Sequence, residues 1–422
     1  MGTAGLLMIA LAACSGSGGG GSMSAVPPVS SPASTAPTTP APAPTQADPV
    51  KRALAKLSVE EKVGQLFMPV VYGTAADSVS GENQARYGVQ TPAKVIDRYH
   101  LGGVILFPAN VKSVDQVVRL TNGMQKAAGL PLLISTDQEN GPVSRMSALM
   151  TPFPGAYRIG ATKDVKVSRA VAKATGEELR ALGVNLDFAP VADVNIDPRN
   201  PVIGKRAFGN RPAEVSKMVA AAVKGFEDAG VAATAKHFPG HGDTHVDSHT
   251  GLPVIDHTRA QWKRLDAPPF KAAIGAGVDA IMSAHIVFPK LDPSGDPATL
   301  SKPILTGLLR QELGFDGVIS TDALNMAGVR EKYGDGEVAV RAVLAGADLL
   351  LMPYDLRKAY DAVLSAAKSG RISERRLDQS VTRLLTLKQA RGLLNEPPVA
   401  SAKEAAQVVG SAAHRKLAAS VP

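Results

Sequence analysis

The chain has 422 residues, with 46 Lys plus Arg, 38 Asp plus Glu and a single cysteine, and 45% of its residues are hydrophobic. This length accommodates two ordinary domains or one large α/β barrel, the composition excludes collagen-like and wholly disordered proteins, and one cysteine excludes both an intramolecular disulfide and a cysteine-based zinc site. The net charge of +8 is spread along the chain and aromatic residues make up only 4%, so nothing indicates a nucleic-acid partner.

The chain opens with an apolar run at 6–13, which is too short to span a bilayer and is followed by Cys14. The sequence Leu-Ala-Ala-Cys at 11–14 resembles the bacterial lipobox, whose cysteine is lipidated after cleavage. We therefore expect a lipoprotein signal at 1–14, a lipid on Cys14 and a membrane-anchored protein on the extracytoplasmic side of the cell envelope. A frayed apolar N-terminus is the alternative interpretation.

Residues 15–48 are rich in Gly and Ser and then in Pro, Thr and Ala. They hold too few large apolar side chains to bury a core, so we expect a flexible linker.

From residue 49 the pattern changes to short apolar runs that alternate with helical patterns. Helices are expected at 113–128, 168–182, 212–230 and 305–313, several of them ended by a glycine. The apolar runs predict eight strands, at 65–71, 102–107, 131–136, 183–189, 230–238, 278–285, 317–323 and 347–353.

This alternation of strands and helices predicts parallel strands joined by right-handed crossovers. Eight such units favour a single (β/α)8 TIM-type barrel over 49–395, with inserted catalytic loops, followed by a C-terminal tail at 396–422. A doubly wound open sheet is the alternative, but no phosphate-binding GxGxxG follows the first strand.

Active sites of such barrels lie where the strands end, and the ionisable residues of this chain fall there. They are Asp137, Glu139 and Arg145 after the third strand, Lys236 and His237 at the end of the fifth, His285 at the end of the sixth and Asp322 at the end of the seventh. Together they predict a polar pocket. The fourth strand leads through Asp187 to Asp193, and loop or cap hydrogen bonding explains these two carboxylates equally well.

The stretch KHFPGHGDTHVDSH at 236–249 holds four of the eight histidines. A metal site would use His237, His241, His245 and Asp247, but their spacing on a loop broken by Gly and Pro differs from that of helix-borne metal motifs. An acid/base pair of Asp247 and His249, in which the carboxylate orients the imidazole, is the favoured interpretation. The third interpretation is that this stretch is a solvent-exposed loop whose histidines have ordinary hydrogen-bond partners.

At this point the residues carry a resemblance. The string KHFPGHG, followed after four residues by DSH, is similar to the signature of the β-N-acetylglucosaminidase branch of glycoside hydrolase family 3. The segments TDQENGPVSRM at 136–146, NPVIGKRAFG at 200–209 and ISTDALNM at 319–326 resemble further landmarks of that family, in the same order. One departure is Pro142, which stands where the family pattern has an arginine, and the chain also stops where many members continue into a second α/β domain.

The resemblance implies a role for each matched residue. Asp322 would be the nucleophile and His249 the acid/base, with Asp247 orienting it. The residues that would bind sugar hydroxyls are Asp137, Arg145, Arg206, Lys236 and His237. Retaining hydrolysis needs a nucleophile and a proton donor, and a histidine can take the donor's role because its pKa lies near working pH. Once neutral, its imidazole is less repelled by a glycosyl-aspartate than a carboxylate would be. No metal or organic cofactor is implied.

We therefore expect a retaining exo-β-N-acetylglucosaminidase that releases non-reducing terminal GlcNAc from peptidoglycan-derived muropeptides. A phosphorylase of the same family, which would use inorganic phosphate as acceptor, is one alternative. A β-glucosidase or β-xylosidase of the same family is disfavoured, because it would lack the Asp–His pair of the HGxxxxDSH motif. A non-catalytic sugar-binding lipoprotein is disfavoured because Asp247, His249 and Asp322 are all present.

Overall fold

The structure is a computed structural model that describes residue 18 and residues 48–246, 251–330, 332–394 and 399–422. The described residues from 48 onward form one compact unit. Cys14 and almost all of the expected linker at 15–48 lie outside the described residues. None of the helices in the described ranges is both long and apolar enough to cross a membrane.

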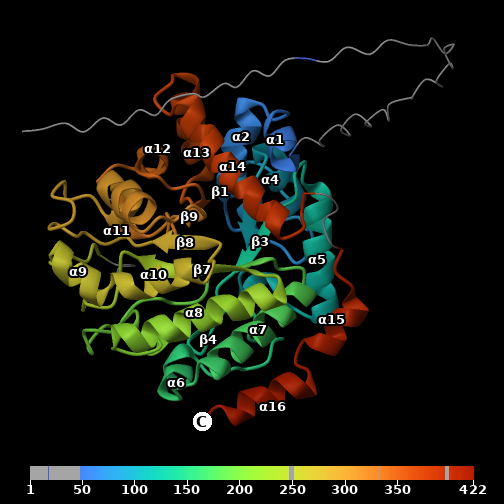
Figure 1. The fold of residues 1–422 in the computed structure, drawn as a ribbon. Helices are drawn as coiled ribbons and strands as arrows, with labels where there is room; N and C mark the ends of the chain where they lie inside the picture. The colour runs from blue at the N-terminus through green and yellow to red at the C-terminus, as the bar shows by residue number, and fades with distance from the viewer. Residues whose placement is uncertain (1–17, 19–47, 247–250, 331, 395–398) are drawn as a thin grey trace, which may run out of the picture. The chain divides into compact units, whose positions relative to one another are not determined.

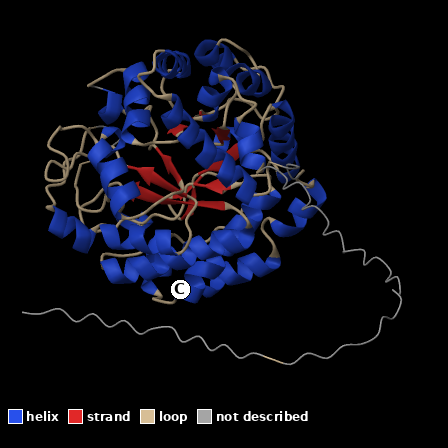
Figure 2. Ribbon diagram, turned by 45° about the horizontal axis from the view of Figure 1, so that its top comes forward, coloured by secondary structure: helices blue, strands red, loops and turns tan. Residues whose placement is uncertain are grey.

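The centre of the unit is a parallel sheet surrounded by helices (Figure 2). Its strands are, in spatial order, β2 (Gly103–Ile105), β3 (Leu133–Thr136), β6 (Leu186–Asp187), β7 (Ala232–Phe238), β8 (Ala280–Ser283) and β9 (Val318–Ser320). A separate parallel pair consists of β1 (Phe67–Met68) and β10 (Leu350–Leu351). Each of these eight strands lies inside one of the eight predicted segments.

The prediction of an α/β fold with a curled parallel sheet is thus confirmed, but a complete (β/α)8 barrel is not. In the described residues, strand pairing between the β1–β10 pair and the six-stranded sheet is limited to isolated bridges, from Val70 to Ile105 and from Ser320 to Leu349. The pair is short for a local reason. Pro69 follows β1 and has no N–H to donate, while Met352 follows β10 with φ 47°, which is not an extended conformation.

Helices cover the outside of the sheet (Figure 1), and their ends carry the expected signals. Ser113 caps α5, and α8 starts with Pro212 and ends at Gly230 with φ 74°. The predicted helix at 305–313 is a π-helix, η4. The helices are α1 (Pro49–Leu54), α2 (Val59–Gln65), α3 (Gly81–Tyr87), α4 (Pro92–Tyr99), η1 (Pro108–Asn110), α5 (Val114–Ala127), α6 (Ala156–Ala161), α7 (Val165–Ala181), η2 (Gly204–Arg206), α8 (Pro212–Ala229), α9 (Arg259–Leu265), α10 (Ala267–Gly275), η3 (Ala298–Leu300), η4 (Pro303–Glu312), α11 (Ala327–Arg330), α12 (Asp335–Ala345), α13 (Leu356–Lys368), α14 (Glu374–Ala390), α15 (Ala402–Val408) and α16 (Ala412–Ser420).

The segment expected as a C-terminal tail contains α15 and α16, which pack against α7. The buried carboxylate of Glu178 on α7 accepts hydrogen bonds from the Gly410 N–H at 3.1 Å and the Thr151 N–H at 2.8 Å, and lies 2.7 Å from His414 Nδ1. A buried carboxylate needs several donors to offset its loss of water. These contacts therefore fix the end of the chain to the core.

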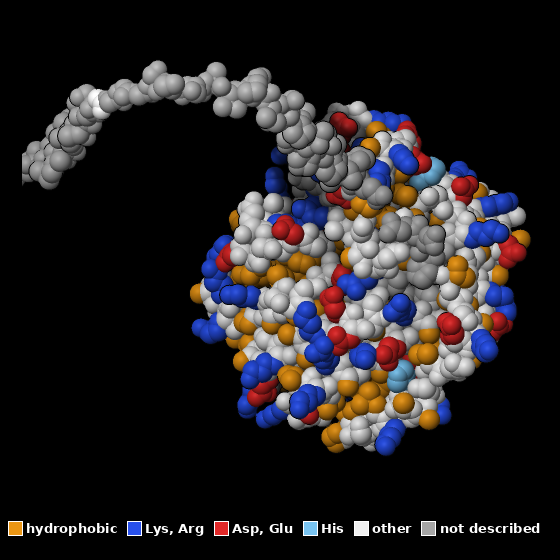
Figure 3. Space-filling view, turned by 45° about the vertical axis from the view of Figure 1, so that its right-hand side comes forward, with side chains coloured by type: hydrophobic (Ala, Val, Ile, Leu, Met, Phe, Trp, Pro, Cys, Tyr) orange, Lys and Arg blue, Asp and Glu red, His pale blue; other side chains and the backbone are white. Residues whose placement is uncertain are grey.

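Lys and Arg side chains are interspersed with acidic and apolar ones on the face shown in Figure 3. Inside the molecule, Lys388 on α14 is fully buried, and its Nζ donates to Gln65 Oε1 at 2.6 Å. Burial lowers the pKa of Lys388 to about 7. Because the unfolded chain keeps a pKa near 10.4, it binds more protons between these values, so this lysine makes stability rise with pH from about 7 to about 10.

The substitution Lys388→Met is expected to raise the free energy of unfolding by about 1–3 kcal/mol at pH 6, because it removes a buried charge and keeps the length of the side chain. The gain should shrink as pH rises from about 7 towards 10, because the folded-state lysine is then neutral while the unfolded chain still keeps its proton. Urea unfolding at both pH values measures this, with the exposed Lys56→Met as control. A gain that does not depend on pH would contradict the assignment.

Candidate active site

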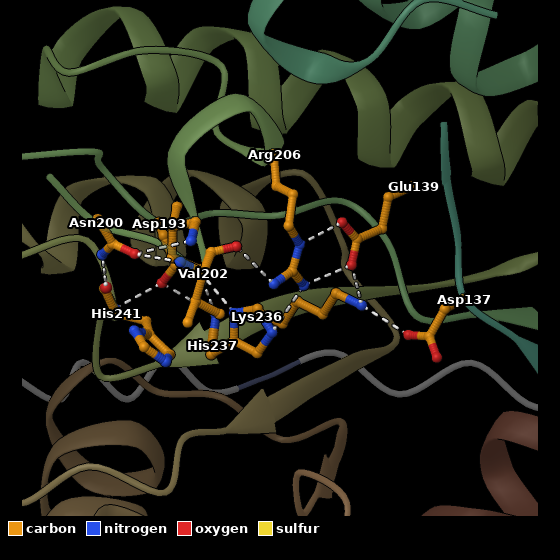
Figure 4. Close-up of polar contacts among 10 residues, drawn as sticks. Asp137, Glu139, Asp193, Asn200, Val202, Arg206, Lys236, His237 and His241 are labelled. Carbon is orange, nitrogen blue, oxygen red and sulfur yellow. Dashed lines mark hydrogen bonds and ion pairs between the residues drawn. The ribbon is translucent and has the colours of Figure 1, made fainter. Parts of the chain in front are cut away.

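Several of the predicted site residues lie close together near the carboxyl ends of the strands, and Figure 4 shows four of them, Asp137, Arg206, Lys236 and His237. Asp137 directly follows β3, Lys236 and His237 end β7, and Asp322 comes two residues after β9. These ends meet at one edge because the strands are parallel.

Lys236 is at the centre of the cluster and is buried. Its Nζ lies 2.8 Å from Asp137 Oδ1 and 2.6 Å from Glu139 Oε1. Burial alone would lower the pKa of Lys236, but the two carboxylates raise it above its ordinary value. The lysine is therefore a fixed positive charge at neutral pH.

Arg206 binds the other side of Glu139. Its Nε and Nη2 donate to the two carboxylate oxygens at 2.8 and 2.7 Å, and its Nη1 donates to the Val202 carbonyl at 3.2 Å. Burial would raise the pKa of Glu139, but Lys236 and Arg206 lower it to about 2. The bidentate geometry fixes the plane of the guanidinium. The segment 200–209 that carries Arg206 is therefore tied to β4 (Gln138–Asn140).

His237 is oriented by a buried carboxylate. Its Nδ1 lies 2.7 Å from Asp193 Oδ2, and its Nε2 lies 3.3 Å from Arg206 Nη2. Because Nε2 faces a group that can only donate, Nδ1 carries the proton and donates it to Asp193. Asp193 also accepts the His241 N–H at 2.7 Å, so one carboxylate fixes both histidines of the KHFPGHG turn.

Asp322 is held by its own loop and by the surrounding positive charge. Its Oδ1 accepts the Ala323 N–H at 2.7 Å. Burial would raise the pKa of Asp322, but His285, His237, the Ala323 amide and Lys236 together lower it. The carboxylate is therefore ionised at neutral pH, which is the state that a nucleophile needs.

Comparison with known proteins decides the family. Residues 58–387 match the Glycosyl hydrolase family 3 N terminal domain. The chain belongs to this family. The resemblance found in the motifs is thereby confirmed.

Individual relatives agree with this membership. The chain is 39% identical to "Beta-hexosaminidase A" of Pseudoalteromonas piscicida, over 86% of this chain and 66% of that protein. It is similar to a family 3 β-N-acetylglucosaminidase structure from Paenibacillus sp. str. FPU-7, with 44% identity and a TM-score of 0.79 over 86% of this chain and 68% of that one. A β-N-acetylhexosaminidase structure from Beutenbergia cavernae is 32% identical, with a TM-score of 0.70 over 79% of this chain and 99% of that one. The chain thus spans about two thirds of the length of the first two.

The family landmark TDQENGPVSRM at 136–146 takes a defined shape here, although Pro142 stands where the family pattern has an arginine. The strands β4 and β5 (Val143–Ser144) form a hairpin, and the turn between them has positive φ at Asn140 and Gly141. The hairpin returns the chain to the site, where the Arg145 N–H donates to the Asp137 carbonyl at 3.1 Å. The Arg145 guanidinium lies over the Phe107 ring at 5.2 Å, beside the cluster of Lys236 and not within its ion pairs.

Glu139 and Asp193 were not among the predicted sugar-binding residues, yet Glu139 holds two of them, Arg206 and Lys236, and Asp193 holds His237. The signal available in the sequence was a carboxylate just beyond a strand end. Asp187 is also buried and accepts the Gln138 N–H at 2.9 Å, and burial raises its pKa well above the ordinary value. Asp187 and Asp193 therefore both accept backbone hydrogen bonds, as the loop interpretation expected.

The predicted acid/base pair Asp247 and His249 lies outside the described residues. Nearby, burial and His237 lower the pKa of His241 to about 4, so this imidazole is neutral. The described residues contain no group of three or more His, Cys, Asp or Glu side chains placed to hold a metal ion.

Proposed function

We propose that this chain is a retaining exo-β-N-acetylglucosaminidase. The observation that carries the proposal is the ionised Asp322 beside the paired cluster of Lys236, Asp137, Glu139 and Arg206, in a family 3 fold. The names of the relatives point to N-acetylhexosaminides as substrates. The charged cluster supplies donors and acceptors for sugar hydroxyls at fixed positions.

In the proposed reaction, a carboxylate oxygen of Asp322 attacks the anomeric carbon, and the bond from that carbon to the leaving oxygen breaks. His249 gives its proton to the leaving oxygen. The neutral imidazole then takes a proton from water, which attacks the glycosyl-aspartate and releases GlcNAc. The positive charge of Lys236 stabilises Asp322 as the leaving carboxylate in this second step.

The test is turnover of an aryl N-acetylglucosaminide by the purified protein, with the aryl glucoside as comparison. We expect the N-acetylglucosaminide to be preferred and the first sugar product to be the β-anomer. Adding inorganic phosphate separates the hydrolase from the phosphorylase, because only the phosphorylase forms a sugar 1-phosphate. Turnover of the glucoside alone would refute the proposed substrate class.

We further propose that the natural substrates are GlcNAc-terminated muropeptides. The expected envelope location supports this proposal, and release of GlcNAc from a purified disaccharide muropeptide tests it.

We also propose that the eight strands act as one closed barrel. The isolated bridges at both edges of the β1–β10 pair support this proposal.

We also propose that Cys14 anchors the protein to the membrane. A single acyl chain binds a membrane only marginally, whereas two or more hold a protein stably. The substitution Cys14→Ser is therefore expected to move the protein from the membrane to the soluble fraction without changing its specific activity. Fractionation with an activity assay measures both, and an unchanged membrane fraction would refute the anchor.

A further inference from the structure

His257 lies at the base of the loop that carries the proposed acid/base pair. Its side chain is buried, with Nδ1 2.6 Å from Asp266 Oδ2 and Nε2 2.7 Å from Asp243 Oδ2. Asp243 and His257 are 14 positions apart, and Asp247 and His249 lie between them in the sequence. The contact of His257 with Asp243 therefore joins the two ends of that loop.

We propose that His257 is a positioning residue, which fixes the base of the acid/base loop by bridging Asp266 and Asp243. This role rests on the proposed function of Asp247 and His249. A general acid must reach its proton acceptor with correct geometry, and a misplacement of about 1 Å can cost 10²-fold in rate. Fixing the ends of the loop reduces the conformations open to the residues between them.

The charges support a protonated bridge. A neutral imidazole donates from one nitrogen only, so bridging two carboxylates requires both ring nitrogens to be protonated. The hydrogen bond with Asp266 raises the pKa of His257, burial opposes this, and the charges of Asp266 and Asp243 add to the increase. Burial raises the pKa of Asp266 to about 6 although His257 opposes it, and Asp243 and Asp193 contribute to the increase.

The segment that contains His257 and Asp266 also supports the turn before Asp243. Trp262 Nε1 donates to the Pro239 carbonyl at 3.0 Å. Gly240 has φ 138°, and a Cβ there would lie 2.8 Å from the Asp266 Cβ, so only glycine allows this close approach. The turn at 239–243 therefore packs directly against α9 and Asp266, and Asp243 lies at its end.

The returning half of the loop has an anchor of its own. Val254 forms a parallel bridge with Val287, and the Ile255 and Val287 amides donate to the Val287 and Pro253 carbonyls, each at 2.9 Å. Because this anchor does not involve His257, loss of the bridge to Asp243 should loosen the base of the loop without unfolding the protein. The effect should therefore be local.

The test uses Asp243, because replacing His257 would leave the buried Asp266 without its partner. Asp243→Ala breaks the bridge at its more exposed end, and Asp243→Asn keeps an oxygen that accepts from Nε2. We expect Asp243→Ala to lower kcat/KM on a GlcNAc disaccharide by about 10- to 100-fold and to change formation of the glycosyl-enzyme from an activated aryl glycoside much less. Asp243→Asn should recover most of this loss. His245→Ala, in the exposed part of the same loop, is the matched control and should remain near wild type.

A double variant tests whether the bridge between His257 and Asp243 acts through the proposed general acid His249. In a His249→Ala background, Asp243→Ala should cause no further loss on the disaccharide. A further loss of the same size, or equal losses on both substrates in the single variant, would overturn the proposal. If the wild-type protein does not act on N-acetylglucosaminides, the proposed function fails instead.

Amide hydrogen exchange tests the bridge independently of activity. Peptides covering 244–252 should exchange about tenfold faster in Asp243→Ala than in wild type at neutral pH. Because the pKa of His257 is raised, the bridge is lost as pH rises through that pKa, so the ratio of the two rates should approach one at alkaline pH. Equal exchange at neutral pH would overturn the bridge, whatever the enzyme acts on.

Discussion

Replacing Asp322 by Asn is expected to lower turnover of an aryl N-acetylglucosaminide by several orders of magnitude while the protein stays folded. The substitution keeps the size of the side chain and its acceptor oxygen for the Ala323 N–H. It removes the negative charge that His285, His237 and Lys236 stabilise, and an amide cannot form the covalent glycosyl ester. Steady-state kinetics and a thermal unfolding curve measure the two parts of this prediction.

A control for this variant is Asp316→Asn, which changes the same residue type at the opposite end of β9 and is exposed. It should have wild-type activity. A slow-leaving fluorinated substrate should label a peptide that contains Asp322 in the wild-type protein. Near-normal activity of a folded Asp322→Asn protein would end the assignment of the nucleophile.

The second large effect is expected from His249→Ala. An acid matters most when the leaving alcohol is poor, so hydrolysis of a GlcNAc disaccharide should fall by about 10²- to 10⁴-fold. Formation of the covalent intermediate from an activated phenyl glycoside should fall much less, because that leaving group departs without a proton. Breakdown of the intermediate should then limit the rate. Stopped-flow release of the phenol and steady-state turnover separate the two steps.

Added azide should restore turnover of the activated substrate in His249→Ala, since an anionic nucleophile needs no base. Asp247→Asn should show the same pattern more weakly, as an orienting partner does. If both substrates lose equal activity and azide gives no rescue, the proton comes from another group. Glu139 would then be a poor candidate, because its pKa of about 2 keeps it ionised at neutral pH.

Residue patterns along the chain are sufficient to predict the eight parallel strands, several helices and the family. Each of the eight strands lies within an apolar run, and α5 and α8 begin and end at the residues that cap them, because strand and helix patterns depend on residues a few positions apart. The order of the motifs also identified family 3, and the strand ends indicated where the ionisable residues meet.

The pairing of the charged groups, in contrast, becomes visible in the folded chain. Arg206 and Glu139 are 67 positions apart and Lys236 and Asp137 are 99 apart, so no local spacing reveals these contacts. The same holds for the C-terminal segment, whose His414 reaches Glu178 across 236 positions. The pairing of strands likewise joins segments far apart in the chain, such as β1 with β10, and this pair meets the six-stranded sheet at isolated bridges. Contacts between distant residues form when packing brings their elements together, and a pattern of neighbours along the chain does not contain that information.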